Sequence, residues 1–248
     1  MSAEPAILLV HGIRTSATMW RHQVEALRAD GYDVLAVDLP GHGTLLQEGF
    51  TVKSALAAID AGVQQLGGRV MLVGLSLGGY YAMAYAAAYP DRVSGLVAAG
   101  CSALPRGPLL TAYRTLARII GRLPDKGLWL NDAMVRRMLP PQGALDVLAG
   151  GTALEVMDPG LKATASLSPL DDLAAYPGPV WLVNGRFDHF RLHERRYLAA
   201  NPKARLIIVP RATHLVSLVQ PERFTDILRR IAAELAAVPR AAIVDDEH

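Results

Sequence analysis

One serine of the chain stands in a pattern that could make its hydroxyl a nucleophile. Gly74, Ser76 and Gly78 form a G-x-S-x-G motif. The motif follows the strand-like run 70–73 and precedes a helical run that ends at Tyr89. A serine on such a sharp turn projects its hydroxyl above the sheet, at a helix N-terminus whose free N–H groups favour negative charge. A Cβ at either glycine would collide with neighbouring chain. The alternative interpretation is a Gly-Ser turn without chemistry.

A serine hydroxyl attacks efficiently only when a base removes its proton, so a histidine should lie nearby. His214 follows the last strand-like run, 206–209. It therefore stands at the carboxyl end of a strand, where open parallel sheets bind ligands. Three other histidines are interpreted as solvated side chains, and two as structural residues close to the site: His22, His193 and His248, then His11 and His42.

Asp188 is the carboxylate that we expect to orient His214. It follows the strand-like run 180–184 and so also stands at a carboxyl end. Asp171 and Asp172 precede this run and are interpreted as the start of a short helix. The alternative interpretation is that Asp188 only holds a loop in place.

Two backbone N–H groups could stabilise the oxyanion that forms during acyl transfer. The N–H of Leu77 directly follows Ser76 at the start of the helix. The N–H of Ile13 is the second candidate, because it follows the first strand-like run at the same edge of the sheet. Gly12 allows a close backbone approach at this point, although a glycine there could also serve only as a turn.

Six short apolar runs alternate with longer helical patterns, and together they must position these groups. The strand-like runs cover residues 6–10, 33–37, 70–74, 93–98, 180–184 and 206–209. The helical patterns cover residues 17–30, 52–66, 77–89, 192–200 and 220–237. Repeated βαβ units build a parallel sheet that helices cover on both faces. The fold class is therefore α/β: a three-layer α/β/α sandwich with a six-stranded, mostly parallel sheet.

The alternation stops within one long insertion, residues 103–169, which shows two helix-like stretches and no strand. Asp158 in this insertion precedes a proline and is typical of a turn. We expect the insertion to form a helical cap over one edge of the sheet. The expected organisation is a core of residues 1–102 and 170–240, a cap of residues 103–169 and a disordered tail of residues 241–248.

Positive charge is concentrated in the same insertion. It holds eight basic and five acidic residues, whereas the rest of the chain holds seventeen basic and eighteen acidic ones. Within the helix-like stretch 109–123, Arg114, Arg118 and Arg122 recur at four-residue spacing, while Leu116 belongs to an apolar face. We interpret the basic residues as a solvated face, with anionic substrates or an anionic membrane surface as alternatives.

Composition excludes several classes of protein. Hydrophobic residues make up 51% of the 248 residues and charged residues 19%, which excludes intrinsic disorder and a coiled coil. The net charge of +2 is too small to indicate a nucleic-acid partner. Cys101 is the single cysteine, so no internal disulfide is expected. The N-terminus shows no signal-peptide pattern, and the cytoplasm is therefore the expected location.

Taken together, these residues resemble the α/β-hydrolases. The order Ser76, Asp188, His214 matches the family order of nucleophile, acid and histidine. Other matching segments are residues 9–12, 38–43 and 220–224. The resemblance covers nearly the whole chain, but the family's two leading strands have no counterpart before the first run, which predicts a reduced sheet of six strands. The insertion is the least family-like part.

The resemblance implies a serine hydrolase with Ser76 as nucleophile, His214 as general base, Asp188 as its orienter, and the N–H groups of Leu77 and Ile13 as the oxyanion hole. We expect it to cleave a carboxylic ester of a small or medium, largely apolar substrate, as a carboxylesterase or lipase-like enzyme does. Carbon–carbon or thioester hydrolysis, acyl transfer, and a non-catalytic ligand-binding protein remain alternatives. Relatives with an aspartate nucleophile, such as epoxide hydrolases, are disfavoured by the serine.

No metal or organic cofactor is implied by these residues. The expected partner is a small-molecule ester or acyl substrate, without nucleic acid and without stable insertion into a membrane. The charge-free stretch 70–90 has the length of a membrane span, but its glycines and tyrosines indicate a buried strand, turn and helix. A homodimer is left open.

Overall fold

A six-stranded sheet forms the centre of the protein. The computed structural model describes residues 4–237, so the expected tail, residues 241–248, lies outside the described residues. The strands are β1 (Ala6–Val10), β2 (Val34–Val37), β3 (Val70–Leu75), β4 (Val93–Ala99), β5 (Val180–Gly185) and β6 (Ala204–Val209). Their order is β2-β1-β3-β4-β5-β6, and every neighbouring pair is parallel. The predicted six-stranded parallel sheet is confirmed.

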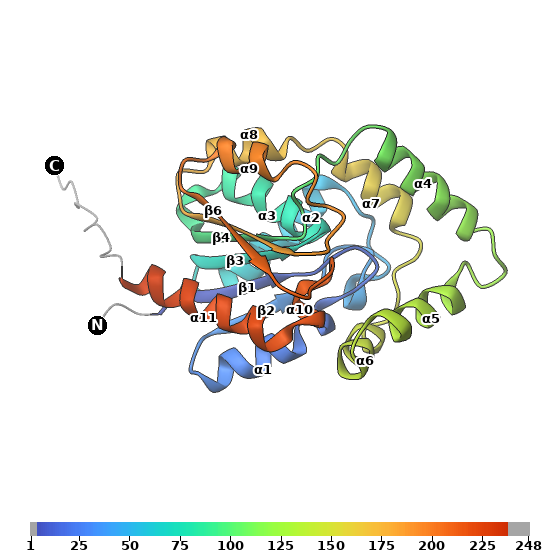
Figure 1. Cartoon of the computed structure of the whole chain (residues 1–248), viewed down its shortest axis with the longest axis horizontal. Coiled ribbons are helices and arrows are strands. Elements are labelled where there is room, and N and C mark those ends of the chain that lie inside the picture. Colours follow the sequence, from blue (N-terminus) through green and yellow to red (C-terminus); the bar gives the residue numbers. More distant parts are fainter. Residues whose placement is uncertain (1–3, 238–248) are drawn as a thin grey trace.

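Helices cover both faces of this sheet (Figure 1). One face carries α1 (Arg21–Ala29) and α11 (Pro221–Ala237). The other carries α2 (Val52–Gln65), α3 (Leu77–Ala88), α8 (Pro169–Ala175) and α9 (Glu194–Ala200). The remaining short elements are η1 (Ala17–Trp20), η2 (Gly43–Leu45), η3 (Pro90–Arg92) and α10 (Val216–Val219). The result is the predicted three-layer sandwich.

The strands are apolar along their whole length because both of their faces are buried. In β1, Leu8 and Val10 pack into the core under α2 and α3, whereas Ile7 and Leu9 pack into the core under α1 and α11. All four side chains are fully buried. The period of two along each strand thus builds two separate hydrophobic cores on one rigid sheet.

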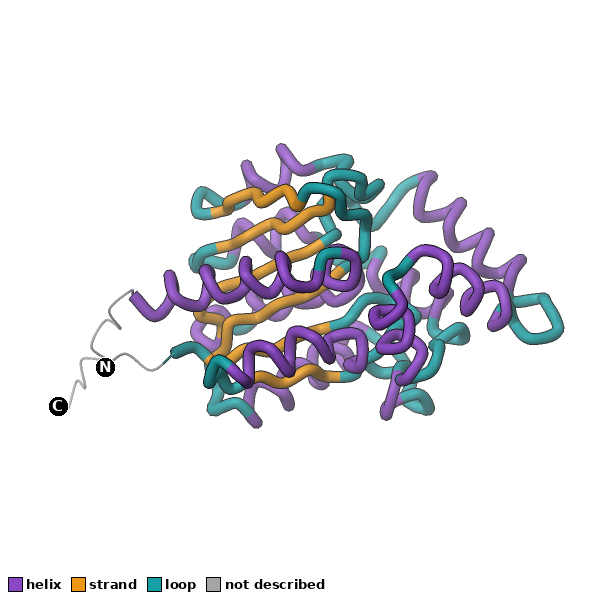
Figure 2. The backbone as a smooth tube through the Cα atoms, turned by 60° about the horizontal axis from the view of Figure 1, so that its bottom comes forward, coloured by secondary structure: helices purple, strands orange, loops and turns teal. Residues whose placement is uncertain are grey.

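The insertion, residues 103–169, contains four helices instead of the two helix-like stretches that the sequence predicted. They are α4 (Pro108–Ile120), α5 (Leu128–Met138), α6 (Pro141–Ala149) and α7 (Met157–Thr164). All four lie beyond the carboxyl ends of the strands, and α4 and α5 project farthest from the sheet (Figures 1 and 2). The short helices are hard to recognise because prolines and glycines interrupt the apolar period every few residues.

Asp158 lies in α7 and not in the turn that the sequence suggested. Pro159 follows it within the first turn of the helix, where the missing N–H of proline costs no intrahelical hydrogen bond. The Asp158 carboxylate accepts hydrogen bonds from Arg114 at 2.8 Å and from Arg118 at 3.1 Å. Two arginines of the basic face therefore fasten α4 to α7.

No helix within residues 4–237 is both long and apolar enough to cross a membrane.

Asp172 on α8 makes stability depend on pH. Burial, and to a smaller extent the neighbouring Asp171, raises the pKa of the Asp172 carboxyl to about 6. Its Oδ2 atom is buried and has no hydrogen-bond partner within residues 4–237. Because the folded protein then holds this proton more tightly than the unfolded chain, stability is lost as the pH rises from about 4 to about 6.

We predict that Asp172→Asn raises the free energy of unfolding at pH 7 by about 1 kcal/mol, since the half-buried position reduces the full linkage effect. At pH 4 the substitution should change stability little. Urea unfolding at the two pH values measures both quantities. Exposed Asp171→Asn is the matched control and should stabilise less. Equal stabilisation at the two pH values would contradict the explanation.

Candidate active site

Ser76 occupies a strained turn between β3 and α3. Its backbone angles are φ 54° and ψ −115°, a combination that costs a residue with a side chain on the order of 1–3 kcal/mol. A Cβ at Gly74 would collide with the carbonyl of Gly78, and a Cβ at Gly78 would collide with the carbonyl oxygens at the end of β1. Only glycine fits at either position, which is the physical content of the G-x-S-x-G motif.

The structure brings Ser76, His214 and Asp188 together from the ends of three strands. Ser76 Oγ lies 2.9 Å from His214 Nε2, and His214 Nδ1 lies 3.1 Å from Asp188 Oδ1. If the imidazole proton is on Nδ1, this N–H donates to Asp188 and Nε2 accepts the hydroxyl proton of Ser76. The arrangement can thus withdraw a proton from the serine and hold the resulting imidazolium.

The Asp188 carboxylate is fully buried, yet it stays ionised. Burial alone would raise its pKa, but the hydrogen bond and the positive charge of His214, together with the Phe190 N–H, lower the pKa below its ordinary value. The Phe190 N–H donates to Oδ1 at 2.8 Å. The ionised carboxylate therefore lies beside His214 and stabilises the imidazolium that forms when His214 accepts a proton.

The two expected oxyanion donors belong to the serine turn itself and to the loop after β1 that passes beside it. The Gly78 N–H donates to the His11 carbonyl at 3.1 Å and joins the loop after β1 to this turn. A Cβ on Gly12 would lie 3.5 Å from the Cβ of Ser76, so the backbone before Ile13 passes close to the serine. Within residues 4–237 neither the Ile13 nor the Leu77 N–H donates to another group. Both can receive an oxygen of a ligand.

His11 and His42 fasten the loops that surround the serine. Both side chains are fully buried, and their ring centres lie 4.7 Å apart. Burial, and then the charge of His42, lowers the pKa of His11 to about 3, so its imidazole is neutral. Its Nε2 accepts the Leu39 N–H at 2.9 Å and links the loop after β2 to the loop after β1. This geometry agrees with the interpretation of His11 and His42 as structural residues close to the site.

Two aromatic residues beside His214 were missed by the sequence interpretation. The ring centres of His189 and Phe190 lie 5.4 Å and 4.6 Å from that of His214. The available signal was position, because both residues directly follow Asp188. His193 was interpreted as solvated, but it is half-buried and its Nδ1 accepts the Leu104 N–H at 3.3 Å. It therefore holds the start of the insertion.

A buried amide supports the acid and the histidine from behind. Asn184 Oδ1 accepts the Gly100 N–H at 3.2 Å, and its Nδ2 donates to Ser102 Oγ at 3.0 Å and to Glu194 Oε1 at 2.7 Å. Gly100 has φ 60°, and a Cβ there would lie 3.1 Å from His214 Nδ1. The amide thus fixes the backbone against which the imidazole rests.

The same amide holds the loop that carries Asp188. Its partner Glu194 also accepts hydrogen bonds from Arg191 Nε at 2.6 Å and from Arg191 Nη2 at 3.1 Å. Arg191 Nη1 donates to the Arg186 carbonyl at 2.8 Å and closes the loop on itself. The Asn184 side chain therefore stabilises both the loop that carries Asp188 and the backbone beside His214.

The insertion lies against the loop that presents Ile13. A Cβ on Gly160 of α7 would lie 3.5 Å from Ile13 Cδ1, and the Ala153 N–H donates to the Arg14 carbonyl at 3.4 Å. A hollow of about 510 Å³ lies between residues 41–50 and the segments 125–128 and 152–159. No group of three or more His, Cys, Asp or Glu side chains that could hold a metal occurs within residues 4–237.

Comparison with known proteins gives matches along most of the chain. A sequence model described as the alpha/beta hydrolase family matches residues 7–227. The 2-hydroxy-6-oxononadienedioate/2-hydroxy-6-oxononatrienedioate hydrolase of Burkholderia vietnamiensis is 41% identical over 103 residues, which are 38% of this chain and 35% of that protein. Epoxide hydrolase B of Mycobacterium tuberculosis is 32% identical over 98 residues, 38% of this chain and 28% of that protein. The chain thus spans about a third of these relatives.

A solved structure resembles the whole fold. The thermophilic esterase of Thermogutta terrifontis, with malate bound, superposes with a TM-score of 0.77 and 26% sequence identity. The match covers 96% of this chain and 92% of that one.

We predict that Asn184→Leu slows the labelling of Ser76 by a fluorophosphonate probe about tenfold or more, because the acid loop and His214 lose a common support. Asn201→Leu is the matched control. Asn201 is also a buried asparagine, but its Nδ2 donates to the carbonyls of Leu173 at 3.0 Å and Tyr176 at 2.7 Å, at the end of α8. It should lose stability and keep the labelling rate. Equal slowing in both variants would mean that Asn184 acts only through stability.

Proposed function

We propose that this chain, which belongs to the alpha/beta hydrolase family, hydrolyses a carboxylic ester of a small or medium, largely apolar substrate through an acyl-enzyme intermediate. The observation that carries the proposal is the unbroken hydrogen-bonded chain from Ser76 through His214 to Asp188, with distances of 2.9 Å and 3.1 Å. A binding protein would need neither this chain nor the strained turn that presents the hydroxyl.

The reaction proceeds in two steps. Ser76 Oγ attacks the carbonyl carbon while its proton moves to His214 Nε2, and the carbonyl oxygen becomes an oxyanion that the N–H groups of Ile13 and Leu77 bind. His214 then protonates the leaving alcohol oxygen as the carbon–oxygen bond breaks, which leaves the acyl group on Ser76. A water molecule repeats the sequence, with His214 as base, and releases the acid. Asp188 remains ionised and stabilises the imidazolium throughout.

Two lines of support favour ester hydrolysis over epoxide opening. The relative whose structure matches the whole fold is named an esterase. Epoxide hydrolase B is also similar over part of the chain, but relatives of that kind open the epoxide with an aspartate, and this chain has Ser76 at the turn. A serine alkoxide would form an ether with an epoxide carbon, and water does not release an ether as it releases an ester.

Carbon–carbon bond hydrolysis is the second candidate. The Burkholderia vietnamiensis relative is named as the hydrolase of an unsaturated oxo-diacid, and 41% identity over 103 residues favours a shared chemistry. The same serine, histidine and oxyanion donors can serve both reactions. The leaving group differs, since a carbanion must be protonated instead of an alkoxide.

We further propose that the insertion acts as a cap that covers the substrate. The support is the contact between α7 and the loop of Ile13, since this places the insertion next to the proposed oxyanion hole. The apolar side chains of α7, and not the exposed ones of α4 and α5, would then face the acyl or alcohol part of the substrate.

We predict that Ser76→Ala and His214→Ala each lower kcat on p-nitrophenyl butyrate by about 10³-fold or more, and that Asp188→Asn costs about as much or somewhat less. Steady-state kinetics on variants with unchanged melting temperature measures this. Absence of turnover by the wild type across short-chain p-nitrophenyl esters would count against esterase activity, and substantial activity in Ser76→Ala would remove the serine from the mechanism.

The two candidate reactions are separable with paired substrates. We expect kcat/KM on acetate to hexanoate esters to exceed that on a 2-hydroxy-6-oxo-dienoate, whose cleavage can be followed by the loss of its ultraviolet absorbance. A reversed preference, with the same dependence on Ser76, would assign carbon–carbon hydrolysis to the chain.

A further inference from the structure

Exposed hydrophobic side chains gather on one part of the protein. Twelve large hydrophobic side chains are exposed within residues 4–107 and 110–237, and eight of them lie on or between α4, α5 and α6: Leu116, Ile119, Leu123, Leu128, Trp129, Met134, Met138 and Leu145. Monomeric soluble proteins rarely leave such a cluster in water without a function. Helices α4 and α5 also project farthest from the sheet (Figures 1 and 2). We call residues 108–139, from the start of α4 to the residue after α5, the α4–α5 tip.

Helix α4 carries more apolar surface than its packing uses. Tyr113 and Ile120 are half-buried, whereas Leu116 and Ile119 are 53% and 56% exposed. Leu116, which belongs to the apolar face predicted for this helix, lies in solvent. Leu123, in the turn after α4, is also exposed. Packing within the insertion therefore leaves these apolar side chains exposed to solvent.

The tip is also positively charged. Residues 108–139 contain six basic and two acidic residues. Arg114, Arg118 and Lys126 are compensated by ion pairs with Asp158 or Glu155. The other three basic residues are exposed and form no ion pair within residues 4–237: Arg122, Arg136 and Arg137. The exposed hydrophobic side chains thus have uncompensated cations among them.

We propose that the α4–α5 tip docks on the surface of an anionic phospholipid membrane. Leu116, Ile119 and Trp129 would enter the headgroup region, and the free arginines would contact anionic headgroups, as an amphipathic interfacial helix does. Trp129 is 75% exposed, and tryptophan is a preferred side chain at this depth of a bilayer. With 13 and 11 residues, α4 and α5 lie on the surface without spanning it.

Charge favours a membrane over a second copy of the chain. A two-fold contact between two tips would bring the same three arginines of each copy against one another, and this repulsion opposes association. An anionic bilayer satisfies both features at once, because it offers negative charge at its surface and apolar volume beneath. The docking does not depend on the proposed hydrolysis, so the two can fail separately.

The test uses the full chain carrying Ser76→Ala, so that no lipid is consumed, and vesicles of phosphatidylcholine with or without phosphatidylglycerol. Trp129 is the exposed member of the three tryptophans, since Trp20 and Trp181 are 0% and 3% exposed. A blue shift of the emission therefore reports the tip directly. We expect co-sedimentation and a blue shift with the anionic vesicles, little of either with phosphatidylcholine alone, and weakening as salt is added.

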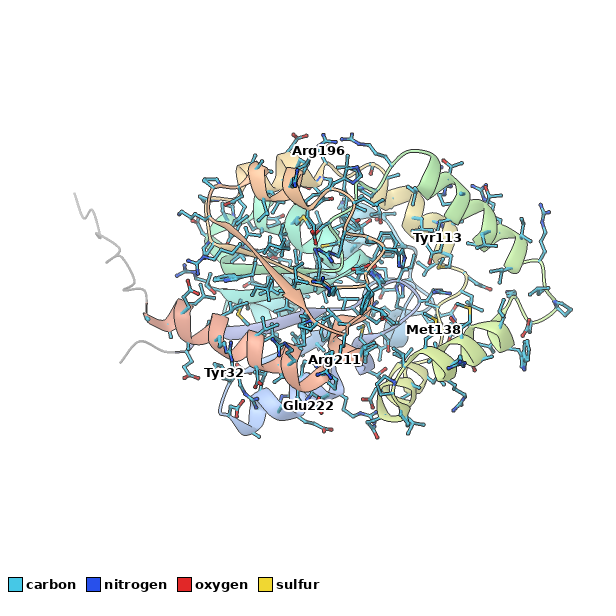
Figure 3. All side chains as sticks on the ribbon, in the orientation of Figure 1. Tyr32, Tyr113, Met138, Arg196, Arg211 and Glu222 are labelled. Carbon is cyan, nitrogen blue, oxygen red and sulfur yellow. The ribbon has the colours of Figure 1, made fainter. Side chains whose placement is uncertain are left out.

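Two matched double variants distinguish binding through the tip from binding through any exposed arginine. Arg136→Gln/Arg137→Gln removes adjacent exposed arginines from α5 and should weaken binding to anionic vesicles about tenfold or more. Arg195→Gln/Arg196→Gln removes the same charge from exposed positions on α9, and this pair should bind like the parent. Figure 3 shows Arg196 on α9, far from Met138 on α5. Equal weakening by both pairs would overturn the proposal.

Leu116→Ser/Ile119→Ser tests the apolar contribution at two exposed positions, where folding should tolerate the change. We expect it to weaken vesicle binding in the Ser76→Ala background. With Ser76 intact, it should leave the melting temperature and the ester turnover unchanged. Failure of the parent protein to bind anionic vesicles at low salt would overturn the proposal. A concentration-dependent dimer that this double variant abolishes would also overturn it, because a second copy would then cover the tip.

Discussion

The structure depends on the contact between the serine turn and the end of β1. Ser76 can hold φ 54° only because α3 starts directly against the backbone that leaves β1, with the Gly78 N–H on the His11 carbonyl. A side chain at Gly78 would push these two segments apart. This one approach fixes the turn that presents the hydroxyl and also holds the loop of Gly12 and Ile13 beside it, as the proposed nucleophile and oxyanion donor would require.

The histidine and the acid come from the other half of the sheet, and their precision comes from a second layer of polar contacts. Asp188 and His214 lie on loops, which are mobile unless they are fastened. Asn184 and Glu194 hold the loop that carries Asp188, while the backbone of Gly100 packs against the imidazole of His214. Burial raises the pKa of Asp188, but the hydrogen bond and the charge of His214 outweigh it and leave the pKa below its ordinary value.

The sequence predicted the sheet well because buried parallel strands are continuous apolar runs, and the strand bounds differ by at most two residues. It also placed Ser76, Asp188 and His214 at one edge, since each follows a strand. The supporting amide of Asn184 could not be predicted, because its partners lie up to 84 residues away. The helices of the insertion were harder still, as short helices gain their stability from packing rather than from a local pattern.

The proposed mechanism requires Ser76 to carry the acyl group between the two steps of ester hydrolysis, which can be measured by intact-protein mass spectrometry after rapid acid quenching, followed by peptide mapping. During turnover of a p-nitrophenyl ester, we expect a mass increase equal to one acyl group, located on the peptide that contains Ser76, with a matching burst of p-nitrophenol. Steady turnover with no acyl group on Ser76 at any quenching time, or with the group on another residue, would contradict it.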